Sequence, residues 1–381
     1  MTAQTQTILV LNSGSSSLKF ALYRPGEQDE DLVLKGSADG IGHSSGSLRL
    51  VSSDGQVLLH QDHLLESRED AFAKAVEAMR AYLPQPPVAV GHRMVHGGPH
   101  LREHQLLTPD VEAQLQAAVH FAPLHIPPAL ALLGLARAAF PSTPQFACFD
   151  TAFHRTMPPV AARLPIPQLY FDQGVQRYGF HGLSYESLVH RLGDALPEKV
   201  VFAHLGNGAS VTAVLRGQSI DTSMGLTPTG GIPMGTRSGD LDPGVLLFLQ
   251  RSGSLDVDAL ESLVNQQCGL AGLSGGESDM QALLSRAKAG DADAELAVNA
   301  FCTAVCKQIG SYAALLGGLD LLVFTGGIGE HSAEVRRRVC ASLGFLGIHA
   351  DDPASTNLKV LPAEEEIQIA RHCRRMFHET A

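Results

Sequence analysis

Apolar and polar positions along the chain mark out short strands that alternate with amphipathic helices. Near the N-terminus, 7–11 and 18–23 are apolar runs that flank a Gly/Ser-rich turn at 12–17, which is typical of a β-hairpin. A related pattern recurs half a chain later, where a second hairpin is predicted over 199–216 around the turn 204–210. Two strand–loop–strand openings of this kind predict two related domains.

Helices are predicted between these hairpins. One spans 68–83 and stops at a proline cluster, and another spans 109–122, with Thr108 as its N-cap and Pro109 in its first turn. Strands at 88–91 and 145–149 each run into a cluster of polar residues. Continuous apolar strands that alternate with helices indicate an α/β fold.

The C-terminal third contains a third strand-to-glycine transition. Residues 320–325 read as a buried strand that delivers a glycine-rich turn at 325–331, and a helix is predicted at 332–343. The whole chain has 381 residues, which is more than one ordinary hydrophobic core supports, so length also predicts two domains.

Charge and composition narrow the class of partners. The net charge is −11, and apart from the arginines at 336–338 there is no basic block, so a dedicated nucleic-acid binder is disfavoured. No apolar run approaches the ~20 residues that a membrane span needs. The N-terminal apolar stretch is too short for a signal peptide. Six scattered cysteines without a C-x-x-C pair favour buried free thiols and a cytoplasmic location.

Three glycine-rich turns, at 12–17, 204–210 and 325–331, each follow a predicted strand. Glycines let backbone N–H groups approach an anion closely, and a helix that begins after such a turn adds its positive end. Together the three turns predict a nucleotide site. The chain has neither a GxxxxGK[ST] loop nor an opening GxGxxG, which disfavours P-loop NTPases and simple dehydrogenases.

Charged side chains lie on other Gly-flanked segments. Arg93, Asp150, His181 and Arg237 each stand in such a segment. A guanidinium offers a planar two-point donor to carboxylate or phosphate, so this set suits a small anionic substrate.

Eight Gly-flanked polar motifs follow one another along almost the whole chain: NSGSSSLK (12–19), GHRMVHGG (91–98), APLH (122–125), FDTAFH (149–154), RYGFHG (177–182), HLGNG (204–208), MGTRSGD (234–240) and GGIGE (326–330). Their sequence and order resemble the acetate kinase family from about residue 8 to about residue 371. The resemblance implies a duplicated actin/RNase H-like kinase fold with ATP in an interdomain cleft, and a homodimer. We expect an N-terminal domain of 1–150 joined by a C-terminal helix at 366–381, and a nucleotide-binding domain of 151–365.

The resemblance also implies roles for single residues. Asp150, His181 and Arg237 match catalytic positions, and Asn12 and Glu365, rather than Glu364 or Glu366, match the metal positions. The positions that match substrate contacts are Arg93, His125, Val95, Leu124, Phe180 and Pro228. The positions that match nucleotide contacts are Lys19, His204, Leu205, Gly206, Asn207, Gly208, Asp279, Met280, Gln281, Gly327, Ile328, Gly329, Glu330 and His331.

The implied reaction is reversible, Mg²⁺-dependent transfer of the ATP γ-phosphoryl group to acetate, giving acetyl phosphate and ADP, with Mn²⁺ as an alternative metal. The family usually assigns proton transfer to Asp150. A carboxylate nucleophile is already ionised at neutral pH, so we expect Asp150 to orient Arg237 or a metal-bound water instead. On that hypothesis an Asp150→Asn variant loses rate without a changed pH profile.

Several positions depart from the family's pattern: Gln281 replaces an Arg, His331 an Asn, Tyr185 a His and Gly230 a Glu. Two alternatives stay open at this point. The same chemistry on propionate or butyrate is one, because one methylene in an apolar pocket is worth only about 1–3 kcal/mol. A non-catalytic nucleotide sensor on the same fold is the other.

Overall fold

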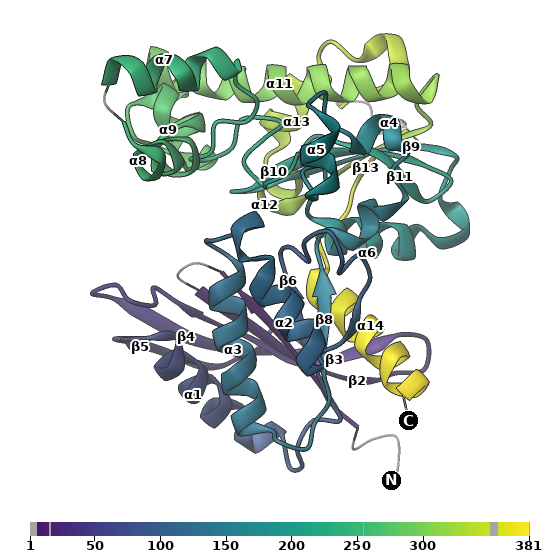
Figure 1. Cartoon of the computed structure of the whole chain (residues 1–381). Helices are drawn as coiled ribbons and strands as arrows, with labels where there is room; N and C mark the ends of the chain where they lie inside the picture. The colour runs from purple at the N-terminus through teal and green to yellow at the C-terminus, as the bar shows by residue number, and fades with distance from the viewer. Residues whose placement is uncertain (1–5, 15–16, 254, 351–356, 381) are drawn as a thin grey trace. The chain divides into compact units, whose positions relative to one another are not determined.

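The computed structural model describes residues 6–14, 17–253, 255–350 and 357–380. The chain forms two compact units (Figure 1). The first comprises Met1–Ala152 together with Glu364–Ala381, and the second comprises Phe153–Ala363. The predicted glycine-rich turn at 12–17 lies partly outside the described residues, which omit 15 and 16.

The first unit is built on a mixed sheet with the strand order β5-β4-β3-β2-β1-β6-β8-β7. The predicted N-terminal hairpin is its centre: β1 pairs antiparallel with β2, and β1 pairs parallel with β6, which in turn pairs parallel with β8. The strands are β1 (Ile8–Ser13), β2 (Ser17–Pro25), β3 (Glu30–Asp39), β4 (Gly46–Ser52), β5 (Val57–His63), β6 (Ala89–Met94), β7 (Gln105–Leu106) and β8 (Gln145–Phe149).

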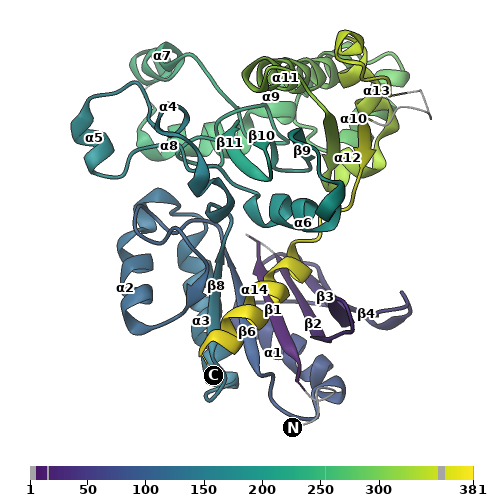
Figure 2. The same ribbon diagram turned by 90° about the vertical axis from the view of Figure 1, so that its right-hand side faces the viewer.

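Helices cover both faces of this sheet. Val90 packs in the same buried cluster as residues of α1 (Arg68–Met79) and α3 (Ile126–Ala139), while a Cβ on the neighbouring Gly91 would meet α14 (Glu365–Thr380). Because neighbouring strand residues point to opposite faces, α14 covers the face opposite α1 and α3 (Figure 2). The C-terminal helix is thus part of the N-terminal unit.

The predicted helices of this unit form with two local differences. The α1 helix ends at Met79 and continues as a 3₁₀ turn over Arg80–Tyr82. The α2 helix (Pro109–Ala117) ends before the predicted 122 and is followed by another 3₁₀ turn. Its N-terminus is as predicted, since the Thr108 side chain accepts a hydrogen bond from the Val111 backbone N–H.

The second unit repeats the core of the first. Its sheet has the order β11-β10-β9-β12-β13, with β9, β10 and β11 antiparallel and β12 and β13 parallel to β9. This is the arrangement of β3-β2-β1-β6-β8, so the predicted duplicated α/β fold is confirmed. The strands are β9 (Lys199–Leu205), β10 (Ala209–Leu215), β11 (Gln218–Thr222), β12 (Leu321–Thr325) and β13 (Leu358–Val360).

The helices of the second unit are α4 (Pro159–Ala162), α5 (Gln168–Asp172), α6 (Gly182–Leu192), α7 (Pro243–Gly253), α8 (Val257–Ser262), α9 (Gly269–Ser274), α10 (Met280–Lys288), α11 (Ala292–Leu316), α12 (Gly326–His331) and α13 (Ala333–Cys340). The predicted glycine turn at 325–331 is therefore a short helix: Gly326 turns the chain with a φ of 77°, and the following residues then wind into α12. None of the described helices combines the length and apolar character that a bilayer span requires.

Candidate functional site

In the first unit, a polar cluster stands where three neighbouring strands end. Asn12 lies near the end of β1, Arg93 lies near the end of β6, and Asp150 directly follows β8. Because β1, β6 and β8 are parallel neighbours, their C-terminal ends bring these side chains to one edge of the sheet. Arg93 donates three hydrogen bonds to Asp150, at 3.0, 3.1 and 2.7 Å, and one to Asn12 Oδ1 at 3.1 Å.

The ion pair between Arg93 and Asp150 is largely shielded from water, with the Asp150 side chain only 1% exposed. Burial raises the pKa of Asp150 to about 6, against the lowering effect of Arg93. Burial alone would lower the pKa of Arg93, but the charges of Asp150 and Glu365 raise it above its usual value. Both groups are therefore charged at neutral pH.

Helix α14 adds two carboxylates to this cluster. Glu365 Oε2 lies 3.6 Å from Arg93 Nε, and Glu366 Oε1 accepts a hydrogen bond from Asn12 Nδ2 at 3.2 Å. The β1–β2 register places the exposed Lys19 directly opposite Asn12. The structure thus brings the expected residues Arg93, Asn12, Asp150 and Glu365 together, with Lys19 on the neighbouring strand, and it adds Glu366 to them.

The remaining expected residues of the first unit lie on the loops that follow β6 and precede α3. Val95 is half-buried just after β6, and His125 is the N-cap residue of α3. Leu124 is an exposed apolar side chain at 47% of its surface.

In the second unit, His181 has a strained backbone. It precedes α6 with φ 59° and ψ 22°, a left-handed conformation that is rare for a residue with a side chain. Its Nδ1 shares a hydrogen bond with Ser210 Oγ at 2.9 Å, and its ring stacks on His204 with centroids 4.2 Å apart. A backbone held in such a conformation by several partners points to a functional side chain.

Arg237 meets His181 across a glycine. A Cβ on Gly208 would lie 3.3 Å from His181 Nε2 and 3.5 Å from Arg237 Nη1, so both side chains reach the same stretch of backbone. Arg237 Nη1 also donates to the Pro228 carbonyl oxygen at 3.2 Å. The expected residues Phe180 and Pro228 are both buried in this unit.

The predicted nucleotide loops of this unit lie side by side. The turn 206–208 joins β9 to β10, and a Cβ on Gly206 would lie 3.8 Å from the Gly327 backbone nitrogen. No heavy atom stands within 4 Å of a Cβ placed on Gly327, so the surface there is open. Glu330 accepts hydrogen bonds from the backbone N–H groups of Gly326 and Ala363, at 3.0 and 2.9 Å, and so fixes the start of α12.

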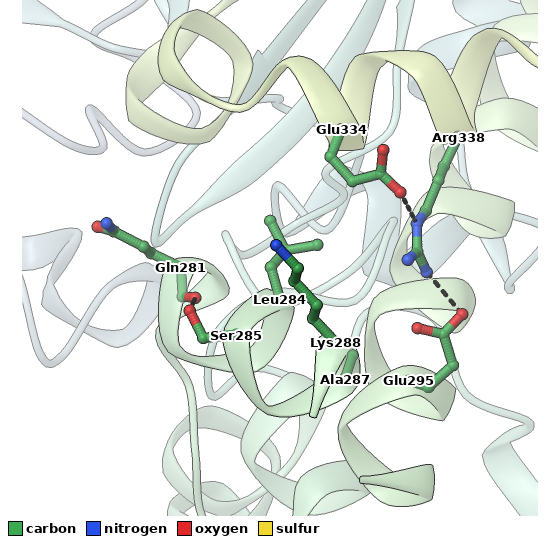
Figure 3. Close-up of a pocket in the computed structure, with 8 residues that line it drawn as sticks. All are labelled: Gln281, Leu284, Ser285, Ala287, Lys288, Glu295, Glu334 and Arg338. Carbon is green, nitrogen blue, oxygen red and sulfur yellow. Dashed lines mark hydrogen bonds and ion pairs between the residues drawn. The ribbon is translucent and has the colours of Figure 1, made fainter. Parts of the chain in front are cut away.

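The 279–281 segment leads into a pocket. Asp279 caps α10 by accepting a hydrogen bond from Ala282 N at 2.8 Å, and Met280 is buried. Gln281 lines an open pocket of about 500 Å³ between α10 and α13. One side is closed by a chain of ion pairs in which Arg338 contacts Glu334 and Glu295 (Figure 3). The lining residues are Gln281, Leu284, Ser285, Ala287, Lys288, Glu295, Glu334 and Arg338.

Sequence reasoning missed the residues that support His181. The Tyr185 hydroxyl lies 2.5 Å from Ser210 Oγ, which is the partner of His181 Nδ1. His154 Nε2 lies 3.0 Å from the Phe180 carbonyl oxygen, and its ring packs against Gly179, whose φ is 75°. The motif glycine before Phe180 was a signal for such a close approach, but nothing in the sequence pairs Tyr185 with Ser210.

Two α/β units share the strand order of their core, the first carries the Arg93 cluster at its strand ends, and the second brings His181 and Arg237 beside Gly208. These features define a two-domain kinase of small anionic substrates. The chain belongs to the acetokinase family, whose model matches residues 7–370. The predicted family and the enzyme class, a phosphotransferase with a carboxyl group as acceptor, are thereby confirmed.

Relatives and solved structures agree. The chain is 41% identical to an acetate kinase of Rhodopseudomonas palustris, with 98% of both chains covered, and 41% identical to one of Deinococcus radiodurans, with 95% and 96% covered. It resembles the crystal structure of a propionate kinase from Francisella tularensis at a TM-score of 0.90 and 35% identity, with 97% and 100% covered. It resembles that of Porphyromonas gingivalis acetate kinase at a TM-score of 0.86 and 34% identity, with 97% and 99% covered.

Proposed function

We propose that the chain is an acetate kinase that transfers the γ-phosphoryl group of ATP reversibly to acetate, giving acetyl phosphate and ADP. The observation that carries the proposal is the half-buried Arg93, which Asp150 and Asn12 hold at the ends of three parallel strands. A guanidinium fixed in this way presents its remaining N–H groups to an anion without paying the entropy of ordering itself. The acetate kinases among its relatives support the choice of acid.

The proposed chemistry is direct attack by a carboxylate oxygen on the γ-phosphorus. Such a transfer depends on positioning and on charge stabilisation more than on covalent help. We assign the acid's carboxylate to Arg93 and the transferring phosphoryl group to Arg237 and His181. If the Ser210 hydroxyl donates the hydrogen bond to His181 Nδ1, the neutral imidazole carries its own proton on Nε2. His181 Nε2 is the ring atom that lies near Gly208, where Arg237 Nη1 also approaches.

We propose that Asn12 and Glu365 hold Mg²⁺, with Glu366 as a third oxygen donor. The donor set fits, because Mg²⁺ prefers carboxylate and amide oxygens, and these side chains already contact the Arg93 cluster. Bound Mg²⁺ would neutralise charge on the nucleotide phosphates. Asn12 and the two carboxylates would hold the ion, and Asp150 keeps Arg93 in place beside them.

We propose that the nucleotide binds the second unit. The adjacent glycine segments at 204–208 and 327–331 offer open backbone N–H groups for phosphates, and Gly327 has free space above its Cα. The pocket at Gln281 is the proposed place of the base and ribose. It holds both donor and acceptor groups, and we propose ATP as the usual co-substrate.

The acid specificity is the finer part of the proposal. We assign Phe180 and Pro228 of the second unit, and Val95 and Leu124 of the first, to contacts with the methyl group of acetate. Similarity to a solved propionate kinase makes propionate the second candidate. A single methylene changes binding by about 1–3 kcal/mol, so the two acids must be compared directly.

We also propose a homodimer in the cytoplasm. Helix α7 carries consecutive apolar residues and has no buried side chain, and Phe248 alone is 66% exposed. Exposed apolar side chains gathered on one segment are normally covered by a partner, and a second copy of the chain would supply the matching face. Light scattering coupled to size exclusion should give twice the 40.4 kDa chain mass. A monomer would contradict the proposal.

The testing experiment traps acyl phosphate with hydroxylamine, using purified protein, MgATP and either acetate, propionate or butyrate. Strong hydroxamate formation with acetate supports the proposal, and stronger formation with propionate moves the assignment to that acid. Nucleotide binding without hydroxamate from any acid would instead indicate the sensor alternative.

A further inference from the structure

Helix α14 is tied to the first unit by ion pairs far from the carboxylates at its start. Arg371 donates two hydrogen bonds to Asp29, at 2.9 and 2.5 Å, in the turn between β2 and β3. One helical turn later, Arg374 Nη1 lies 3.1 Å from Glu30 Oε1. Asp29 and Glu30 are consecutive in the sequence, so this short segment is ion-paired to α14 at two positions one helical turn apart.

The two-point geometry restricts how the helix can move. A guanidinium that pairs in parallel with both oxygens of one carboxylate fixes orientation as well as distance. Arg371 donates a further hydrogen bond to Gln368 of the same helix at 2.9 Å, which holds its side chain in place. The pair with Asp29 therefore resists both rotation of α14 and sliding along its axis.

The body of α14 lies close to the sheet at one particular place. A Cβ on Gly91 would lie 2.5 Å from Cys373 Sγ and 2.5 Å from Ile369 Cγ2, so the helix touches the β6 backbone two residues before Arg93. Ile369 and Cys373 are fully buried. A helix packed in this way moves as a rigid rod. Arg371 lies about 9 Å along the helix axis from Glu365, at ~1.5 Å per residue, so a shift of the helix at Arg371 also shifts Glu365.

The contact of Glu30 with α14 includes a feature that lowers the stability of the folded chain. Its side chain is buried, and its Oε2 has no hydrogen-bond partner among the described residues. A buried carboxylate oxygen without a partner is costly, and burial accordingly raises the pKa of Glu30. Because burying the Glu30 carboxylate costs free energy, we attribute its pair with Arg374 to a need to fix the position of α14 and not to a gain in stability.

We propose that Asp29 and Arg371 are positioning residues for the metal site, and that their pairing sets the register at which α14 presents Glu365 and Glu366 beside Asn12. The inference rests on the proposed metal role of Asn12 and Glu365. It extends that role to a pair that lies outside the site and contacts neither substrate nor metal.

The test compares Asp29→Asn with Asp31→Asn. Asp31 is a matched control, since it lies two residues away and its own pair with Arg24 is long, at 3.9 Å, with both side chains more than half exposed. Mn²⁺ binding is measured from the electron paramagnetic resonance signal of free Mn²⁺ in the presence of ADP, and the melting temperature is recorded for each variant. The Mg²⁺ concentration that half-saturates the reaction is a second readout.

We expect Asp29→Asn to weaken Mn²⁺ binding three- to tenfold and to raise the half-saturating Mg²⁺ concentration by the same factor, with the KM for acetate unchanged when Mg²⁺ is saturating. Asp31→Asn should match the wild type. Exchanging the charges, as Asp29→Arg with Arg371→Asp, should restore much of the metal affinity that either single change removes.

A lower melting temperature with unchanged Mn²⁺ binding would show a merely structural pair and overturn the inference, as would absent Mn²⁺ binding by the wild type. Failure of the proposed function gives a different result. A wild type that forms no acyl phosphate, but whose Mn²⁺ binding still responds to Asp29→Asn, would leave the positioning role standing.

Discussion

Replacing Asp150 by asparagine tests whether this carboxylate acts by holding Arg93. Three hydrogen bonds now join the two side chains, at N···O distances of 3.0, 3.1 and 2.7 Å. An asparagine of the same shape offers one acceptor oxygen, and its NH₂ group would face a guanidinium that can only donate. The change therefore removes at least one charge-assisted hydrogen bond, together with the charge behind the others.

The expected size of the effect follows from these bonds. A hydrogen bond to a charged group contributes about 1.5–3 kcal/mol. Arg93 keeps Asn12 at 3.1 Å and Glu365 at 3.6 Å, so it is weakened rather than released. A loss of about 3 kcal/mol in the transition state corresponds to a roughly 100-fold fall in kcat/KM, since about 1.36 kcal/mol is tenfold.

The assay is hydroxamate formation with acetate and MgATP at several pH values, with melting temperatures to confirm folding. Asp31→Asn serves again as the control for an acidic residue on the surface. An Asp150→Asn enzyme within fivefold of the wild-type kcat/KM would refute the reasoning, because Arg93 would then need no such partner.

The structure changes the pH test that the sequence alone suggests. Burial raises the pKa of Asp150 to about 6, so the ionised form that holds Arg93 is present above that pH and is lost as the pH falls through it. The wild-type rate should therefore have an acidic limb near pH 6, and Asp150→Asn should lack it, whether Asp150 orients Arg93 or transfers a proton. The two roles separate in heavy water: orientation predicts a solvent isotope effect on kcat near one, and proton transfer in the slow step predicts a clearly larger one.

Three other changes should have distinct outcomes. Gly208→Ala places a methyl group 3.3 Å from His181 Nε2 and 3.5 Å from Arg237 Nη1, so kcat should fall roughly tenfold with the fold intact. The control is Gly225→Ala, whose methyl group meets nothing within 4 Å and which should have wild-type activity in the same hydroxamate assay. Gly91→Ala forces a methyl group into two α14 side chains and should destabilise the first unit by about 1–3 kcal/mol, seen as a lower melting temperature; unchanged melting would contradict the packing described. Chelation with EDTA should abolish hydroxamate formation and added Mg²⁺ should restore it, and activity that persists in EDTA would exclude the proposed metal role.

Local chemistry in the sequence predicted a large part of the fold. The β1–β2 and β9–β10 hairpins, the strand Gln145–Phe149 and the Thr108 cap all follow from the periodicity and turn residues within a few positions of each element. The repeated hairpin also predicted the duplicated sheet, since the same short pattern begins both units. These are features that neighbouring residues determine by themselves.

Contacts between distant segments were not predictable in the same way. Three glycines within four residues argued for a turn at 325–331, yet one left-handed residue at Gly326 suffices and the rest form α12. The support of His181 by Ser210 and Tyr185 depends on how a helix end meets a strand. No period or spacing in the sequence encodes such a pairing, because both hydroxyl residues look like ordinary buried positions.

The polar cluster of the first unit also has a charge balance that bears on its function. Arg93 is one positive charge, and Asp150, Glu365 and Glu366 are three negative ones around it. The carboxylate of a substrate acid would be repelled by this cluster, because the net charge of the four side chains is negative and Asp150 is shielded from water. A divalent cation beside Asn12 would balance the excess, and Arg93 could then attract a carboxylate. On this argument the α14 carboxylates and Arg93 are interdependent: without the metal, the residues that would bind it also weaken the binding of the acid, so acetate affinity should fall together with metal occupancy.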